Sequence, residues 1–402
     1  MPLVSLLIDV LLFAAAALIA VPSTVFLLQV LLARAGRPAA AAVAPTQLRP
    51  SVAVLVPAHD ESGGIAEALA TVVPQLATGD RLLVVADNCS DDTAAVARAA
   101  GAEVVERDDP CRRGKGYALD FGVRALAGRP PQVVVVMDAD CALEPDAIDR
   151  LAKRCAEAGR PVQALYLMHG APGAGLRVRL AEFAWVVRNH VRPLGLARCG
   201  LPCQLMGTGM AFPWEKLRTA PLASSHLVED MQLGIDLAIA GAAPLFCPQA
   251  RVHSVFASQV EAVVSQRTRW EHGHLSVIGR AAPRLFWQGV RQARLDLLAM
   301  ALDLCVPPLA ALLLLALALA LLCGVAVAFG AARAPLLIVL YALLAITVAT
   351  LLARRRFAAG IVSAADLLAV PGYVLGKLPI YARFLRRRQI DWIRTKRGDG
   401  PS

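Results

Sequence analysis

The chain has 402 residues, 57% of them hydrophobic, and a formal charge of +10 at pH 7. This composition is too apolar for an ordinary soluble protein, and the apolar residues concentrate near the two ends. The net positive charge comes mostly from basic clusters that flank these apolar segments, where they suit anionic inner-leaflet lipids. Aromatic residues make up only 5% of the chain. Stacking platforms for bases are therefore scarce, and we expect no nucleic-acid partner.

The first apolar segment, residues 3–33, contains a single charge and ends at Arg34 and Arg37. About 20 apolar residues are enough to cross a bilayer. A cleaved signal peptide is the alternative, but no basic residue precedes the segment, and it is longer than a signal-peptide core. We expect a retained transmembrane helix over residues 1–35 and an Ala- and Pro-rich linker over 36–49.

Two more apolar blocks fall within residues 296–353 and end at the arginine run 354–356. Short loops rich in arginine stay in the cytoplasm. The basic ends of the first and third spans therefore place the intervening region on the cytoplasmic side of an inner (plasma) membrane. In residues 354–402, basic clusters flank an apolar stretch that Asp366 and Pro371 interrupt. This pattern favours an interfacial helix and a basic tail over a fourth span.

The middle of the chain, residues 50–255, alternates short β-rich runs with helical stretches. The runs SVAVLVP (51–57), RLLVVAD (81–87) and QVVVVMD (132–138) each end at polar residues. This alternation predicts an α/β domain that is Rossmann-like, with a mostly parallel sheet. Ligands of such sheets bind beyond the carboxyl ends of the strands.

Acidic residues follow all three runs: Asp60 and Glu61, then Asp87, then Asp138 and Asp140. One acidic strand end is ordinary, because helix N-caps favour such residues. Three acidic ends in one sheet converge on one crevice. A cation held between Asp138 and Asp140 would offset the repulsion between these two carboxylates, and oxygen ligands suit a divalent ion.

Three further features are weaker when taken singly. Lys115 stands between two glycines before a helix and can meet a phosphate, although a solvated basic turn is the ordinary interpretation. Glu229 and Asp230 begin a predicted helix, where simple capping is the alternative. The small-residue turn MGTGMAF (206–212) would let a sugar ring approach the backbone.

The stretch SQRTRWEHGH lies in residues 256–295, which we expect to form interfacial helices. Gln266, Arg269 and Trp270 share one helix face. An amide, a guanidinium and an indole suit a diphosphate and a sugar ring. An amphipathic interfacial helix with a Trp anchor is the alternative.

In order, PAHDE, DNCSDDT, GKGYALD, MDAD, VED and QRTRW resemble the motifs of membrane-bound family 2 glycosyltransferases of the polysaccharide-synthase-like branch. The resemblance covers about residues 50–280. It implies a GT-A fold, a nucleoside-diphosphate sugar donor (a UDP-sugar foremost), Mg²⁺ or Mn²⁺, and inversion at the anomeric carbon. The chain departs from the family at Val228, where a threonine is usual, and in the turn LMGTG. The second departure leaves the acceptor and processivity open.

The resemblance also implies a role for each site residue. The catalytic carboxylates would be Asp230, the general base, and Glu229. The metal ligands would be Asp138 and Asp140. The nucleotide-sugar-binding residues would be Asp60, Glu61, Asp87, Lys115, Asp138, Gln266 and Arg269. The acceptor-binding residues would be Gly207, Thr208, Gly209 and Trp270.

These implications predict a transferase that adds one sugar, or a few, to a lipid-linked or polysaccharide acceptor, in exopolysaccharide or glycolipid synthesis. One alternative is a processive synthase that also translocates its product, with polysaccharide assembly partners. Three spans are few for such a channel. Another alternative is a catalytically silent scaffold of an export complex. A scaffold would be expected to have lost its acids, whereas all the motif carboxylates are present.

Overall fold

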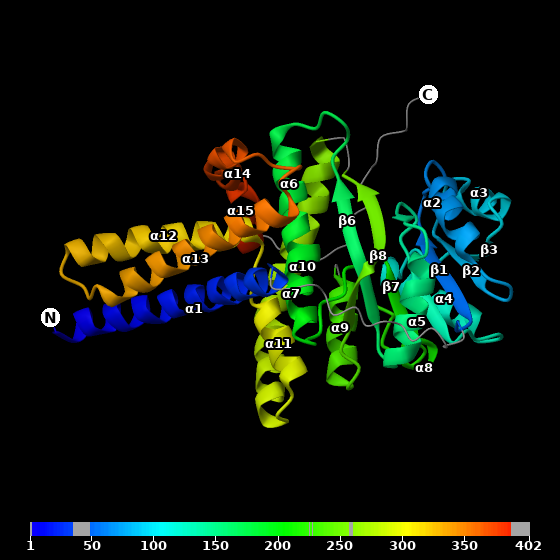
Figure 1. Cartoon of the computed structure of the whole chain (residues 1–402), viewed down its shortest axis with the longest axis horizontal. Coiled ribbons are helices and arrows are strands. Elements are labelled where there is room, and N and C mark those ends of the chain that lie inside the picture. The colour runs from blue at the N-terminus through cyan, green and yellow to red at the C-terminus, as the bar shows by residue number, and fades with distance from the viewer. Residues whose placement is uncertain (1, 35–48, 225, 227, 257–259, 387–402) are drawn as a thin grey trace.

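The chain folds into an α/β body with a bundle of three long helices at one end (Figure 1). The bundle consists of α1 (Pro2–Arg34), α12 (Leu309–Ala328) and α13 (Ala334–Phe357). The computed structural model describes residues 2–34, 49–224, 226, 228–256 and 260–386, without the side chains of 2, 260–267, 269, 385 and 386.

The described part of the body contains an eight-stranded sheet in the order β3-β2-β1-β4-β7-β6-β8-β5. Parallel pairing joins β3, β2, β1 and β4, and also β6 to β8. Strand β7 runs antiparallel to β4 and β6, and β5 runs antiparallel to β8. The sheet is therefore mixed but mostly parallel. Its strands are β1 (Val52–Ala58), β2 (Arg81–Asp87), β3 (Glu103–Arg107), β4 (Val133–Val136), β5 (Ala142–Leu143), β6 (Val162–His169), β7 (Met210–Pro213) and β8 (Leu245–Val255).

Helices cover both faces of the sheet, as the continuous apolar strands require. Along β1, Val54 belongs to the core on one face and Leu55 to the core on the other, and both are fully buried. Helix α4 lies close to β1, because a Cβ on Gly122 would stand 2.4 Å from a Leu55 methyl group. The helices of the body are α2 (Ile65–Val72), η1 (Val73–Gln75), α3 (Thr93–Ala99), α4 (Lys115–Leu126), α5 (Ala147–Ala158), α6 (Leu176–Val186), η2 (Val187–Val191), α7 (Arg192–Arg198), α8 (Trp214–Leu217), α9 (Glu229–Ile239), α10 (Val260–Arg291) and α11 (Leu295–Leu304).

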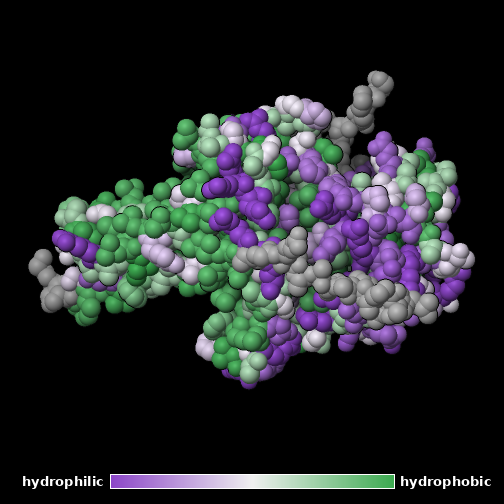
Figure 2. All heavy atoms as spheres, viewed as in Figure 1, coloured by the Kyte–Doolittle hydropathy of each residue, from purple (hydrophilic) through white to green (hydrophobic). Residues whose placement is uncertain are grey.

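Within the described residues, α1, α12 and α13 are the three helices long and apolar enough to span a membrane. Large apolar side chains such as Leu18 and Leu321 are exposed on them, at 75% and 71%. Figure 2 shows hydrophobic residues covering the bundle, whereas hydrophilic residues gather over the sheet. A bilayer is the environment in which such a surface is satisfied.

A buried polar network joins the bundle to the body. The Gln29 amide of α1 donates to Asp303 of α11 at 2.7 Å, and Arg192 of α7 donates to both Asp303 (2.8 Å) and Gln29 (3.0 Å). Helix α7 crosses α1 closely, because a Cβ on Gly195 would lie 2.1 Å from the Gln29 carbonyl oxygen. The end of α1 is therefore part of the folded body.

After α13 the chain folds back in three short helices, η3 (Ala365–Ala369), α14 (Val370–Leu375) and α15 (Leu378–Arg386). The segment is broken near Gly376, and its predicted position in the membrane interface stays a prediction. Lys377 contacts Glu271 of α10 at 2.5 Å and so anchors this segment to the body. The predicted linker, except residue 49, and the tail from 387 lie outside the described residues.

Candidate active site

A cleft of about 250 Å³ opens at the carboxyl ends of β1, β2 and β4. Acidic side chains reach it from several elements, as parallel strand ends allow. Residues that line it include Glu61, Asp87, Lys115, Asp138, Asp140, Tyr166, Trp185, Arg188, Asn189, Gly207, Glu229, Asp230 and Trp270. The structure thus brings together most of the residues that the sequence predicted for one site.

Asp138 and Asp140 follow β4 at the floor of this cleft. The Asp138 backbone N–H donates to the Thr208 hydroxyl at 3.0 Å, which fixes the turn. The carboxylate oxygens of both aspartates and the Cys141 sulfur lie within 4.8 Å of one another. Burial raises the pKa of the Cys141 thiol well above its usual value, and hard cations such as Mg²⁺ and Mn²⁺ prefer oxygen ligands to sulfur. The two carboxylates remain as a hard oxygen donor set that fits a small divalent cation.

Lys115 begins α4 and connects the two halves of the cleft. Its ammonium group contacts the Asp138 carboxylate and donates to the Gly207 carbonyl at 2.7 Å. Burial disfavours the charged form, but the carboxylates of Asp138 and Glu229 outweigh it and raise the pKa of Lys115 above its usual value. Lys115 therefore supplies a permanent positive charge among the acids.

Glu229 and Asp230 occupy the first turn of α9, opposite Asp138. Burial raises the pKa of both carboxyls, and their mutual repulsion raises that of Glu229 further, to about 7. Lys115 and Arg188 oppose the shift of Asp230. A carboxylate with a raised pKa is a stronger base than an exposed one. Both carboxyls line the cleft, so this pair can take up a proton there.

The residue before this pair is Val228, where the resembled family has threonine. Val228 is 8% exposed and packs against α10. A Cβ on Gly273 would stand 2.5 Å from a Val228 methyl group, so the two helices touch at this point. The departure therefore affects packing and leaves both carboxylates in the cleft.

Of the three acids predicted to bind the nucleotide near the ends of β1 and β2, two line the cleft and one does not. Glu61 and Asp87 line the cleft. Asp87 is only 6% exposed and forms an ion pair of 2.5 Å with Arg107. Burial raises the pKa of Asp87, and Arg107 opposes this shift. Asp60 is not among the residues that line the cleft; it accepts a hydrogen bond of 2.6 Å from the Ser90 backbone N–H. Asp60 thus holds the loop after β2.

The turn formed by residues 207–209 mainly supports the cleft, and only Gly207 of the three residues lines it. Gly207 lines the cleft at a φ of 95°, and its missing side chain leaves room for the Asp230 carboxylate. Thr208 is fully buried, and Gly209 packs against β6 and β8. Thr208 and Gly209 support the turn and are not among the residues that line the cleft, and their predicted contact with an acceptor stays a prediction.

The helix that carries Gln266, Arg269 and Trp270 is α10. Trp270 lines the cleft and lies against Trp185, with ring centroids 4.8 Å apart. The side chains of Gln266 and Arg269 lie outside the described part of the structure. Their predicted contacts with a diphosphate stay a prediction.

Sequence reasoning missed Arg188 and Asn189, which line the cleft from the π-helical turn η2. Such turns are rare and often occur at functional sites. Trp185 and Asn189 both donate to the carbonyl of Tyr166, at 3.1 and 3.4 Å. The available signal was an arginine and an asparagine inside the apolar stretch WVVRNHV.

The fold is that of the GT-A class. A solved structure of a mannosyltransferase from Pyrobaculum calidifontis, in complex with GDP-Man and Mn²⁺, is similar to this chain with a TM-score of 0.55. The two share 18% identity, and the similarity covers 94% of this chain and 100% of that one. The chain thus joins a GT-A domain, with acids gathered at the carboxyl edge of its sheet, to three helices that are long and apolar enough to span a membrane.

The chain belongs to glycosyltransferase family 2, because the family model described as "Glycosyltransferase like family 2" matches residues 50–273. An uncharacterized glycosyltransferase of Mycobacterium tuberculosis is 34% identical over 194 residues, which covers 44% of this chain and 83% of that protein. Glucosyl-3-phosphoglycerate synthase of Mycolicibacterium paratuberculosis is 38% identical over 97 residues, or 22% of this chain and 28% of that protein.

Proposed function

We propose that the chain is an inverting glycosyltransferase that moves a sugar from a nucleoside-diphosphate sugar to a lipid-linked or glycan acceptor at the cytoplasmic membrane face. One observation carries the proposal. Two acid pairs, Asp138 with Asp140 and Glu229 with Asp230, line one cleft, and Lys115 contacts Asp138 and lies close to Asp230. The pair Asp138 and Asp140 suits the cation of a bound diphosphate, and the pair Glu229 and Asp230 suits an acceptor hydroxyl.

The reaction needs a base and a stabilised leaving group. Asp230 takes the proton of the acceptor hydroxyl as its oxygen attacks the anomeric carbon, and the bond from that carbon to the diphosphate breaks. Lys115 supplies fixed positive charge where the leaving group gains negative charge. Its contacts with Asp138 and the Gly207 carbonyl hold the ammonium group in place.

A divalent cation is part of the proposal. Asp140, together with Asp138, would hold Mg²⁺ or Mn²⁺, and the mannosyltransferase of similar fold was solved with GDP-Man and Mn²⁺. When bound, the ion would neutralise charge on the diphosphate. Glu61 and Asp87 line the same cleft, and in this proposal they would contact the nucleoside of a donor such as a UDP-sugar.

The proposed orientation rests on the distribution of arginines. Arg34 ends α1, and Arg354, Arg355 and Arg356 end α13 beside the body. Basic residues at span ends mark the cytoplasmic side. The catalytic body would then lie in the cytoplasm, against an inner membrane that α1, α12 and α13 cross.

Substituting Asp230→Asn tests the assignment directly. We expect transfer to fall by more than 1,000-fold, in line with the loss of a general base, whereas donor binding changes by less than about threefold. Asp236→Asn, on the same helix, is the matched control and should retain transfer. Undiminished transfer by Asp230→Asn would refute the proposed base. Products with a single added sugar, from purified enzyme and labelled donor, would separate this function from processive synthesis.

A further inference from the structure

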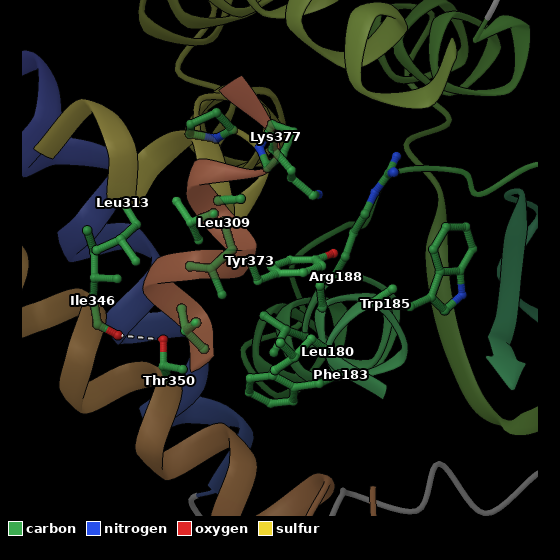
Figure 3. A pocket seen from close by; sticks show the side chains of 18 of the residues that line it. Leu180, Phe183, Trp185, Arg188, Leu309, Leu313, Ile346, Thr350, Tyr373 and Lys377 are labelled. Atoms are coloured by element: carbon green, nitrogen blue, oxygen red, sulfur yellow. Dashed lines mark hydrogen bonds between the residues drawn. The ribbon is translucent and has the colours of Figure 1, made fainter. Parts of the chain in front are cut away.

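A second cavity, of about 360 Å³, lies where the membrane helices meet the body. Figure 3 shows side chains from α6, α12, α13 and α14 around it, among them Phe183, Leu313, Ile346 and Tyr373. This volume is within the range of small-molecule sites. Most of its lining is apolar, so the cavity suits a hydrocarbon chain better than a sugar chain, whose hydroxyls would lose their hydrogen bonds.

This cavity adjoins the catalytic cleft. Trp185, Arg188 and Trp270 line both spaces, so one molecule can occupy the cavity and present its end to the cleft. At the other end, Leu351 of α13 lines the cavity and is 49% exposed on the membrane-spanning bundle. The cavity therefore shares lining residues with the catalytic cleft and also with the exposed apolar surface of the bundle.

A positively charged side chain, that of Arg188, lines both the cavity and the catalytic cleft. Of the cations that line the cavity, Arg192 pairs with Asp303 at 2.8 Å and Lys377 with Glu271 at 2.5 Å. Arg188 has no ion pair or hydrogen bond with any side chain that the structure describes, and its guanidinium lies 6.0 Å from the Trp185 ring centroid. It is held there by the π-helical turn η2. The carboxylates of Asp230, Asp303 and Glu271 act on Arg188 electrostatically, but none of them forms a direct ion pair with it. A partly buried guanidinium without a direct ion pair suits a phosphate.

We propose that the acceptor is a lipid with a phosphate-bearing head group, whose apolar chain occupies this cavity and whose phosphate binds Arg188. The inference rests on the proposed function, since it takes the cleft as the place of sugar transfer. Bound in this way, the lipid brings a hydroxyl of its head group to Asp230, while the sugar donor enters from the side of Asp87.

The test measures binding separately from transfer. The full chain is placed in phosphatidylcholine nanodiscs, and saturable binding of radiolabelled hexadecyl phosphate is measured against protein-free discs. Hexadecanol and inorganic phosphate serve as competitors. We expect hexadecanol to compete at least tenfold more weakly than unlabelled hexadecyl phosphate, and millimolar inorganic phosphate not to compete. Equal competition by inorganic phosphate would assign Arg188 to free phosphate and overturn the proposal.

Two matched pairs of variants locate the site. Leu313→Trp fills the cavity, whereas Leu315→Trp adds the same side chain where α12 is 53% exposed. We expect the first to weaken hexadecyl phosphate binding at least tenfold and the second by less than twofold. Arg188→Gln should remove the preference for hexadecyl phosphate over hexadecanol, Arg188→Lys should restore part of it, and Arg177→Gln, an exposed arginine of α6, should leave it unchanged.

The outcomes separate this inference from the proposed function. Saturable lipid binding without any donor turnover would support the lipid site and refute the transferase assignment. Donor turnover without saturable lipid binding, or equal effects of Leu313→Trp and Leu315→Trp, would refute the lipid site alone. A raised KM for the donor in Arg188→Gln, with the lipid preference intact, would assign Arg188 to the donor and overturn its role here.

Discussion

Replacing Lys115 with methionine should move the acid limb of the pH–activity profile. Lys115 Nζ and Asp230 Oδ2 both lie within 4 Å of the position that a Cβ on Gly207 would take, so they are at most about 7 Å apart. At an effective dielectric constant of about 20, a unit charge pair at that distance is worth about 2 kcal/mol, or roughly one to two pKa units. Solvent screening in the partly exposed cleft reduces this to about one unit.

The direction follows from the cause of the shift. Burial already raises the pKa of Asp230, and Lys115 lowers it. Without Lys115 the pKa of Asp230 rises further, so the deprotonated base is available only at higher pH. We expect the acid limb of kcat/KM to move up by about one unit, because this ratio reports the free enzyme, together with a lower plateau from weaker donor binding.

The assay is nucleoside-diphosphate release between about pH 5 and 9, in which kcat/KM is fitted at each pH. Lys115→Arg keeps the charge and should keep the wild-type limb. Lys153→Met removes a lysine from the surface of α5 and should change neither limb nor plateau. An unmoved acid limb in Lys115→Met, with activity still measurable, would refute the electrostatic coupling between Lys115 and the base.

Three other predictions concern packing, metal and orientation. Gly195→Ala should lower the melting temperature of the solubilised protein, because its Cβ would lie 2.1 Å from the Gln29 carbonyl oxygen and overpacking costs about 1–3 kcal/mol. Gly128→Ala is the control and should leave the melting temperature unchanged, because its Cβ would meet nothing within 4 Å. Equal melting temperatures of the two variants would contradict the close crossing of α1 and α7. Excess chelator should lower sugar transfer by more than 100-fold. Adding Mn²⁺ or Mg²⁺ should restore transfer in the wild type but not in Asp140→Asn. Transfer that resists the chelator would exclude a role for the metal. A membrane-impermeant maleimide should label the exposed Cys111 in lysed cells and not in intact spheroplasts, and labelling of intact spheroplasts would place the body on the opposite side.

The strands β1, β2 and β4 could be predicted from the sequence, because short stretches of the chain are enough to identify them. β1, β2 and β4 are continuous apolar runs, and the acids of the cleft follow them directly. β8 is different: it contains Pro248, alternates buried with exposed residues, and pairs with β6 through a register shift next to Ala164. Its place in the sheet depends on pairing between distant segments, which periodicity does not reveal.

The same contrast holds within the site. Asp138 and Lys115 could be named from short motifs, yet their direct contact spans 23 positions and depends on how α4 packs against the sheet. Arg188 could not be assigned, because its place between the two cavities follows from a π-helical turn and from the membrane helices. The burial of Thr208 and its hydrogen bond with Asp138 could not be predicted, because they depend on tertiary packing.

Helix α1 has 33 residues and is therefore about 50 Å long, well beyond the roughly 30 Å thickness of a hydrocarbon core. Its surplus length is locked into the body by Gln29, Asp303 and Arg192. In the proposed membrane placement, this junction would hold the catalytic centre at a fixed height above the lipid surface. The reach of the acceptor would then have to match that height, so that a substrate whose reactive group lies much deeper or much further out would not react, whatever its chemistry.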